Sequence, residues 1–194
     1  MRLSRGRPTN GSRNRDLTVR LLSRRSAAGR LVGLGLDVPC AIGRGGVTAV
    51  KREGDGKTPA GRHAVLSGRF RADRMRRPAS ALPLRAIRPR DGWCDAPADR
   101  NYNRPVALPY PASCESLCRA DGVYDVVIVL DVNIRRRLRG RGSAIFFHLA
   151  RPGHTPTEGC VAVSRADMAK ILGKIRPGCR IVVPGHERPR PPSR

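Results

Sequence analysis

Short runs of apolar and β-branched residues, each ended by Gly, Pro or a charged residue, are the feature that most constrains the fold of this chain. Runs of four to nine residues favour strands over helices, and the 21 Gly and 17 Pro supply the turns between them. The sequence therefore predicts a mainly β fold. The predicted strands cover residues 17–22, 31–36, 38–42, 47–50, 63–66, 124–132, 143–149, 160–164 and 180–183.

Two stretches are predicted as short helices. One covers residues 112–121, with Ser113 as its N-cap, and the other runs from Ser164 to about residue 175. With 194 residues the chain is long enough for one domain with a real core, which we place at residues 17–183. Residues 1–16 are predicted as a disordered basic lead-in and residues 184–194 as a disordered tail rich in Pro and Arg.

The formal net charge of +24 makes nucleic-acid binding the first class of function to consider. However, 35 of the 39 basic residues are Arg and they are spread along the whole chain. Only 4% of residues are aromatic, which leaves few side chains on which bases could stack. We therefore predict no specific nucleic-acid partner. A basic nucleic-acid-binding protein without catalytic activity is kept as an alternative function.

Two apparent ligand-binding patterns fail on spacing. Gly56-Lys57-Thr58 resembles part of a phosphate-binding loop, but the position of the required earlier glycine holds Lys51. Cys114 and Cys118 are four residues apart, and the other cysteines add no standard zinc spacing. We predict neither ATP binding nor a metal site. The six cysteines also lack the spacing of a disulfide framework; a pair could oxidise after export, although the sequence does not say which.

The stretch 143–164 holds the best candidates for chemistry. His148 lies near the end of one predicted strand, Cys160 opens the next, and the residues between them are rich in Gly and Pro. If the two strands pair as a hairpin, alternation of side chains brings an imidazole and a thiol to the mouth of one loop. A neighbouring imidazole activates a thiol for nucleophilic attack. Backbone amides around Gly159 and Cys160 are candidates for binding an oxyanion.

The residues around this cysteine resemble the catalytic segment of the L,D-transpeptidases, the YkuD family. The family's Ser/Thr-His-Gly-Cys signature appears here as Thr157-Glu158-Gly159-Cys160, with His148 upstream. Glu158 replaces the usual second histidine, as in a compact subgroup with Thr-Glu-Gly-Cys. The segment from Gly54 to Gly61 also matches a Gly-Asp-Gly-x-Thr-Pro-x-Gly loop of the same family. This loop lies before the predicted strand 63–66, and we predict His63 to be a strand residue.

The resemblance implies a sandwich-like β domain and a thioester mechanism without a metal or organic cofactor. Cys160 would be the nucleophile, His148 its base and Gly159 part of the oxyanion site; Thr157 and Glu158 would be candidates for substrate contact. The implied substrates are peptidoglycan stem peptides, joined by 3→3 cross-links, and the implied inhibitors are carbapenem β-lactams. The alternative is an L,D-carboxypeptidase that resolves the same acyl-enzyme with water. The role of the polar loop 91–105 stays open between substrate contact and capping of the sheet.

The resemblance implies the cell envelope as the compartment. No uninterrupted apolar run of the length of a secretory signal is visible near the start of the sequence, and no stretch predicts a transmembrane helix. Ser23-Arg24-Arg25 is similar to a twin-arginine signal, but Arg30 and Asp37 interrupt the region that would have to be apolar. A cytoplasmic enzyme of muropeptide recycling is the alternative.

Overall fold

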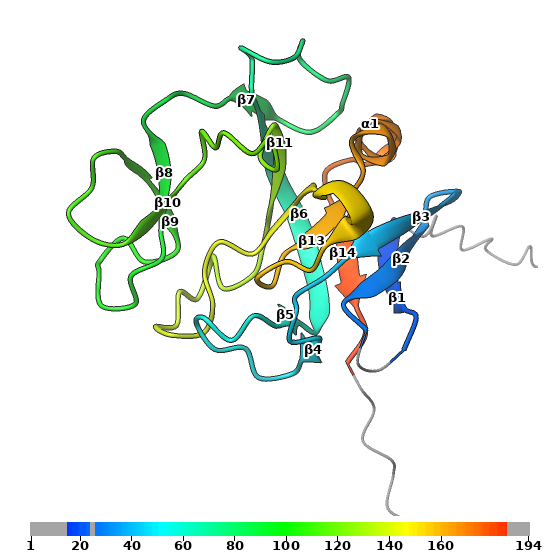
Figure 1. Cartoon of the computed structure of the whole chain (residues 1–194), viewed down its shortest axis with the longest axis horizontal. Helices are drawn as coiled ribbons and strands as arrows, with labels where there is room; N and C mark the ends of the chain where they lie inside the picture. The colour runs from blue at the N-terminus through cyan, green and yellow to red at the C-terminus, as the bar shows by residue number, and fades with distance from the viewer. Residues whose placement is uncertain (1–14, 24–25, 186–194) are drawn as a thin grey trace, which may run out of the picture.

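The computed structural model describes residues 15–23 and 26–185, and Figure 1 shows their arrangement. They form fourteen strands, one α-helix and one short 3-10 helix. The predicted mainly β class with one or two short helices is confirmed. The elements are β1 (Asp16–Leu21), β2 (Ala28–Gly33), β3 (Leu36–Ala41), β4 (Val47–Thr48), β5 (Thr58–Pro59), β6 (Gly61–Phe70), β7 (Leu84–Ala86), β8 (Asp91–Cys94), β9 (Arg104–Ala107), β10 (Cys114–Ser116), β11 (Val126–Leu130), β12 (Phe146–Leu149), η1 (Pro152–His154), β13 (Val161–Val163), α1 (Arg165–Lys174) and β14 (Arg180–Val183).

Nine of the strands belong to one sheet, in the order β11-β12-β13-β3-β2-β1-β14-β6-β7. β6 also pairs with β11 through the register Val126↔Phe70 to Leu130↔Val65, so the sheet curls round and meets itself. The sandwich-like layering therefore arises from one curled sheet with a shared core. The predicted central strand near residues 124–132 is confirmed as β11, whose five residues are all buried between β12 and β6.

The core fills the space inside this curled sheet. It contains Leu31 from β2, Ile128 from β11, Phe147 from β12 and Ile181 from β14, each at most 1% exposed. α1 covers one opening and adds three buried side chains, Met168, Ile171 and Leu172. As predicted, the Ser164 side chain caps this helix by accepting a hydrogen bond from the Asp167 N–H.

A second apolar cluster lies on the other face of β11 and β12, where the small sheet β10-β8-β9 packs. In Figure 1 this small sheet lies on the side of the molecule opposite β1, β2 and β3. Trp93 from β8, Tyr124, and Phe146 from β12 meet edge to face, with ring centroids 5.0 and 5.8 Å from that of Phe146. Cys160 belongs to this cluster, so the cluster borders the pocket that Cys160 lines.

The predicted helix over residues 112–121 is wrong. Residues Cys114–Ser116 form β10, which pairs antiparallel with β8, and the Leu117 N–H extends the ladder to the Asp91 carbonyl. The stretch is short, follows Pro111 and is rich in Cys and Ser, which are weak helix formers. Cross-strand hydrogen bonds and burial of Leu117 therefore outweigh the weak local preference for helix.

The hairpin expected between the strands of His148 and Cys160 is also wrong. β12 and β13 are neighbours but run parallel, with the register Phe147↔Val161, His148↔Ala162 and Leu149↔Val163. Parallel neighbouring strands need a connection that returns the chain to the end of the sheet where the first strand began. Residues 150–160, including η1, form that connection. The predicted lead-in and tail lie almost wholly outside the described residues, as do Arg24 and Arg25.

Candidate active site

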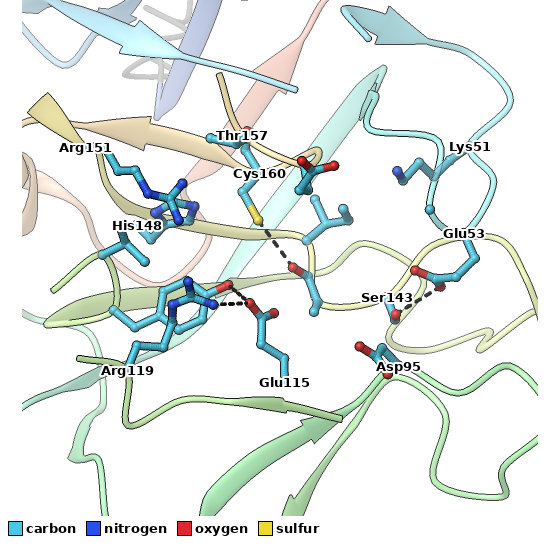
Figure 2. Close-up of a pocket in the computed structure, with 16 residues that line it drawn as sticks. Lys51, Glu53, Asp95, Glu115, Arg119, Ser143, His148, Arg151, Thr157 and Cys160 are labelled. Carbon is cyan, nitrogen blue, oxygen red and sulfur yellow. Dashed lines mark hydrogen bonds and ion pairs between the residues drawn. The ribbon is translucent and has the colours of Figure 1, made fainter. Parts of the chain in front are cut away.

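A pocket of about 420 Å³ opens beside the end of β12 and the start of β13. Both His148 and Cys160 line it, and Figure 2 shows the imidazole and the sulfur at its border. In the parallel register His148 faces Ala162, so Cys160 is two positions away on the same face of the sheet. Cα atoms at such diagonal positions are about 8 Å apart, a span that two side chains pointing the same way can bridge.

Cys160 is 7% exposed, and its thiol sits between two backbone groups. Its sulfur accepts a hydrogen bond from the Phe146 N–H and donates one to the Ala144 carbonyl, both at 3.3 Å. Burial raises the pKa of Cys160 to about 12, although the Phe146 amide and the charge of Lys51 oppose this rise. The thiol is therefore neutral at rest, with its proton directed at a carbonyl.

His148 is equally buried, and its protonation can be assigned from one contact. Its Nδ1 lies 2.9 Å from the Leu149 carbonyl, which can only accept, so Nδ1 carries the proton and Nε2 has the lone pair. The ring packs edge to face on Tyr124, with 5.2 Å between centroids. Burial, reinforced by the charges of Arg151 and Arg119, lowers the pKa of His148 to about 4. At neutral pH the imidazole is thus an unprotonated base held in one orientation.

Thr157 and Gly159 shape the turn that presents the thiol. The Thr157 hydroxyl donates to the Cys160 carbonyl at 2.7 Å and accepts from the Gly159 N–H at 3.1 Å, which ties the turn internally. Gly159 has φ +132°, and a Cβ there would lie 2.8 Å from the Lys57 carbonyl oxygen. Only glycine fits this position without strain. Because the Gly159 amide is bonded to Thr157, the Cys160 amide is the better candidate donor to an oxyanion.

The two motifs of the family resemblance lie against each other in this structure. Besides the approach of Lys57 to Gly159, the Arg44 N–H donates to the Thr157 carbonyl and the Gly45 N–H to the Gly56 carbonyl. Within the Gly54–Gly61 segment, Asp55 accepts from the Lys57 N–H at 2.9 Å and pairs with the buried Lys51 ammonium. The segment thus supports the turn of Cys160.

Glu158 points away from the thiol. Its side chain is 72% exposed and forms an ion pair with Arg44 at 3.1 Å, at the rim of the pocket. A carboxylate in this position exerts little influence on the ionisation of the buried sulfur, because solvent screens it. His63, predicted as a strand residue, lies in β6 and its Nε2 contacts the Pro59 carbonyl at 2.9 Å.

Sequence reasoning missed the residues that hold the carbonyl facing the thiol. Asn103 is buried; its Oδ1 accepts from Trp93 Nε1 at 2.9 Å and from the Ala144 N–H at 3.1 Å, while its Nδ2 donates to the Val132 carbonyl at 3.1 Å. Ala144 has φ +50° and supplies the carbonyl that accepts from Cys160. The loop 91–105 therefore takes part in the site, and the signal was its content of Trp and Asn in a polar stretch.

Charged side chains cover both ends of the pocket around Cys160. In Figure 2, Arg119 and Arg151 lie near His148, whereas Lys51, Glu53, Ser143 and Asp95 lie toward the other end. Glu115 accepts from the Tyr124 hydroxyl at 2.9 Å and from Arg119 at 3.1 Å, and Glu53 accepts from Ser143 at 2.9 Å. The Asp95 Oδ1 is buried and has no hydrogen-bond partner among the described residues.

The lining thus holds four carboxylates, from Glu53, Asp95, Glu115 and Glu158, against three cationic side chains. The chain as a whole carries +24, so acidic groups are concentrated at this pocket. A lining with both signs of charge suits a ligand that carries both ammonium and carboxylate groups. Among the described residues, no group of three or more His, Cys, Asp or Glu side chains is arranged to hold a metal ion.

A buried thiol and an oriented imidazole on one face of a curled β-sheet, at a charged pocket, define a site with the parts for acyl transfer through sulfur. Comparison with protein families agrees with this class. The model of the YkuD L,D-transpeptidase catalytic domain matches residues 24–183, and the chain belongs to this family. The family acts on peptidoglycan peptides. Searches of curated proteins and of solved structures gave no significant match.

Proposed function

We propose that this protein is an L,D-transpeptidase that forms 3→3 cross-links between peptidoglycan stem peptides through a thioester on Cys160. The observation that carries the proposal is the shared pocket of Cys160 and His148 in a chain of this family. The donor is a tetrapeptide stem with a diaminopimelate at its third position. The acceptor is the side-chain amine of a second stem.

In the first step the thiol turns its proton from the Ala144 carbonyl to Nε2 of His148, and the sulfur attacks the donor carbonyl. The Cys160 amide holds the oxyanion of the tetrahedral intermediate. The imidazolium then gives its proton to the leaving amine, D-alanine departs, and the thioester remains. In the second step the acceptor amine attacks the thioester, His148 takes the amine's proton, and the returning proton restores the thiol.

The charges of the pocket support an amine-bearing acceptor. Glu53, Asp95 and Glu115 line the pocket with carboxylates in addition to that of the solvent-exposed Glu158. The Asp95 Oδ1, which has no hydrogen-bond partner in the described part of the chain, can accept an ammonium hydrogen. Glu158, which the sequence suggested as a substrate contact, is engaged by Arg44 at the rim, and Thr157 acts through the turn that it ties.

The cell envelope, where stem peptides are cross-linked, is the compartment that we propose. Among the described residues, no helix has the length and apolar character to span a membrane.

The proposal is tested in two halves with the purified full chain. Incubation with a carbapenem, followed by intact mass measurement, is expected to show one adduct on Cys160. The adduct is absent in Cys160→Ala and forms at least about 100-fold more slowly in His148→Gln, because general-base catalysis contributes roughly 10²–10⁴. A wild-type protein that stays unmodified contradicts the thioester mechanism.

The second half uses tetrapeptide stems with and without an acceptor amine. Cross-linked dimers with loss of D-alanine are expected when the acceptor is present. Tripeptide alone, whatever the acceptor concentration, identifies an L,D-carboxypeptidase instead. Binding to DNA that falls steeply with salt, together with an inert Cys160, would support the basic-binder alternative.

A further inference from the structure

Two cysteines lie opposite each other in the small sheet, apart from the pocket chemistry. In the antiparallel pair β8–β10, Cys94 faces Cys114 directly, next to the pair Trp93↔Glu115. The flanking bonds fix the phase of this ladder: the Asp95 N–H donates to the Ser113 carbonyl at 3.2 Å and the Leu117 N–H to the Asp91 carbonyl at 2.9 Å. Hydrogen-bonded and non-hydrogen-bonded pairs alternate, so Cys94 and Cys114 form a non-hydrogen-bonded pair.

This phase matters because it brings side chains closest together. Facing residues in a non-hydrogen-bonded pair have Cα atoms about 4.5 Å apart, inside the range of roughly 4.4–6.8 Å that a disulfide spans. Both side chains point to the same face of the small sheet. Burial raises the pKa of the Cys94 thiol, and the nearby Asp99, Asp95 and Cys114 add to the rise, in accord with two thiols in each other's neighbourhood.

The other described cysteines have no such partner in the sheet register. Cys118 lies beyond the end of β10, while Cys40, Cys160 and Cys179 lie in or beside other elements. All six cysteines are free thiols in this structure. Cys114 is half-buried and accessible to a reagent, whereas Cys94 is fully buried. The accessible thiol can react first and the buried thiol second.

We propose that Cys94 and Cys114 are a site of disulfide formation, and that a small-molecule or protein disulfide is the oxidant. The Cys114 thiolate attacks one sulfur of the oxidant and expels a thiolate, which leaves a mixed disulfide on Cys114. Cys94 then loses its proton and attacks the Cys114 sulfur, and the second thiolate departs. The protein loses two thiol hydrogens, and the oxidant is reduced to two thiols.

The bridge lies on the face of the hairpin that is turned away from the pocket. Because side chains alternate along a strand, Trp93, Asp95 and Glu115 point to the opposite face, where Trp93 packs in the second apolar cluster and the two carboxylates line the pocket. The bridge therefore fastens β8, which Asp95 follows directly, to β10, which carries Glu115, and leaves Cys160 unpaired. This inference does not depend on the proposed function, since it involves no reaction of Cys160.

The test uses the reduced full chain, oxidised glutathione as the oxidant, and peptide mapping after the remaining thiols have been blocked with iodoacetamide. Trypsin gives residues 91–100 with Cys94 and residues 101–119 with Cys114 and Cys118, because the Arg104–Pro105 bond resists cleavage. A further cut after Glu115 separates Cys114 from Cys118. The expected product is a cross-link between Cys94 and Cys114, with a loss of two alkylation sites.

Two variants control the assignment. Cys118→Ser is expected to keep the cross-link at the wild-type yield, and Cys114→Ser to abolish it. Oxidation in concentrated urea, where the register is lost, is expected to spread the cross-links over several pairs. A folded protein that takes up only glutathione, or that joins Cys94 to Cys118, would overturn the proposal, and a circular dichroism spectrum of each variant shows that it is folded.

Discussion

The rate at which Cys160 reacts with a simple alkylating agent tests the electrostatics of the site directly. Burial raises the pKa of this thiol to about 12. At pH 7 the thiolate fraction is then about 10⁻⁵, against about 3% for a free thiol of pKa 8.5. The more basic thiolate is a better nucleophile and recovers a factor of roughly 30. Cys160 should therefore react about 100-fold more slowly than a free thiol at pH 7.

The assay is iodoacetamide labelling of the folded protein between pH 6 and 10, with quantification of the Cys160 peptide by mass spectrometry. A short unstructured peptide with one cysteine serves as the reference in the same tube. We expect the rate at Cys160 to rise about tenfold per pH unit across the whole range, because the pH stays below the pKa of about 12. The reference levels off near pH 8.5.

His148→Gln separates the two ways in which the imidazole can act. His148 is neutral above about pH 5, since its pKa is lowered to about 4, so it does not hold a resting thiolate. Iodoacetamide labelling should then change less than about threefold in the variant, while acylation by a carbapenem falls about 100-fold. Fast labelling at pH 6 that is lost in His148→Gln would show a preformed thiolate–imidazolium pair and refute this account.

Four further outcomes follow from the same contacts. The pKa of His148 in the folded protein is about 4, below its usual 6.5, so its contribution to the free energy of unfolding is complete above pH 6.5 and falls by roughly 3 kcal/mol as the pH drops to 4. Urea unfolding at pH 7 and at pH 4 should show a smaller decrease in His148→Gln than in the wild type. Thr157→Val strands the two buried backbone groups that the hydroxyl pairs and should lower the free energy of unfolding by about 2–3 kcal/mol, whereas equal loss in Thr157→Ser, which keeps the hydroxyl, would count against this. Gly159→Ala meets a carbonyl oxygen at 2.8 Å and should cost more than about 2 kcal/mol and slow acylation, while Gly140→Ala, at φ +70° with nothing within 4 Å and outside the pocket lining, costs about 1 kcal/mol and leaves acylation unchanged. Asn103→Asp keeps the acceptor for Trp93 and Ala144 but loses the donors, so its carbapenem acylation should fall less than that of Asn103→Ala; the reverse order would remove Asn103 from the positioning of the site.

Local patterns in the sequence were sufficient for most of the fold. Strand positions such as β6, β11 and β14 follow from short apolar runs between turn residues, and α1 follows from its Ser164 cap and its buried positions. These features depend on neighbours within a few residues, which is why one sequence suffices to predict them. The helix expected over residues 112–121 failed because its strand partner, β8, is about twenty residues away along the chain.

The candidate site divides in the same way. The residues around Cys160, together with the preceding His148, made these two side chains the candidates for catalysis. The family match agrees with the resemblance on which that prediction rests, and both side chains line the pocket. No local pattern predicted the relative direction of β12 and β13. The two strands are parallel, so His148 and Cys160 share a face of the sheet at diagonal positions and do not meet across a hairpin. Glu158 pairs with Arg44, more than a hundred residues earlier, which no local pattern indicated.

The sequence by itself determined the class of fold, because residue type and spacing carry that information over short distances, and its resemblance to the family made Cys160 and His148 the candidates for the site. Only the tertiary structure decided which carbonyl faces the thiol, that Asn103 holds it, and that Cys94 lies opposite Cys114. The physical reason is that strand partners and registers are fixed by burial and hydrogen bonding between segments that are far apart in the chain.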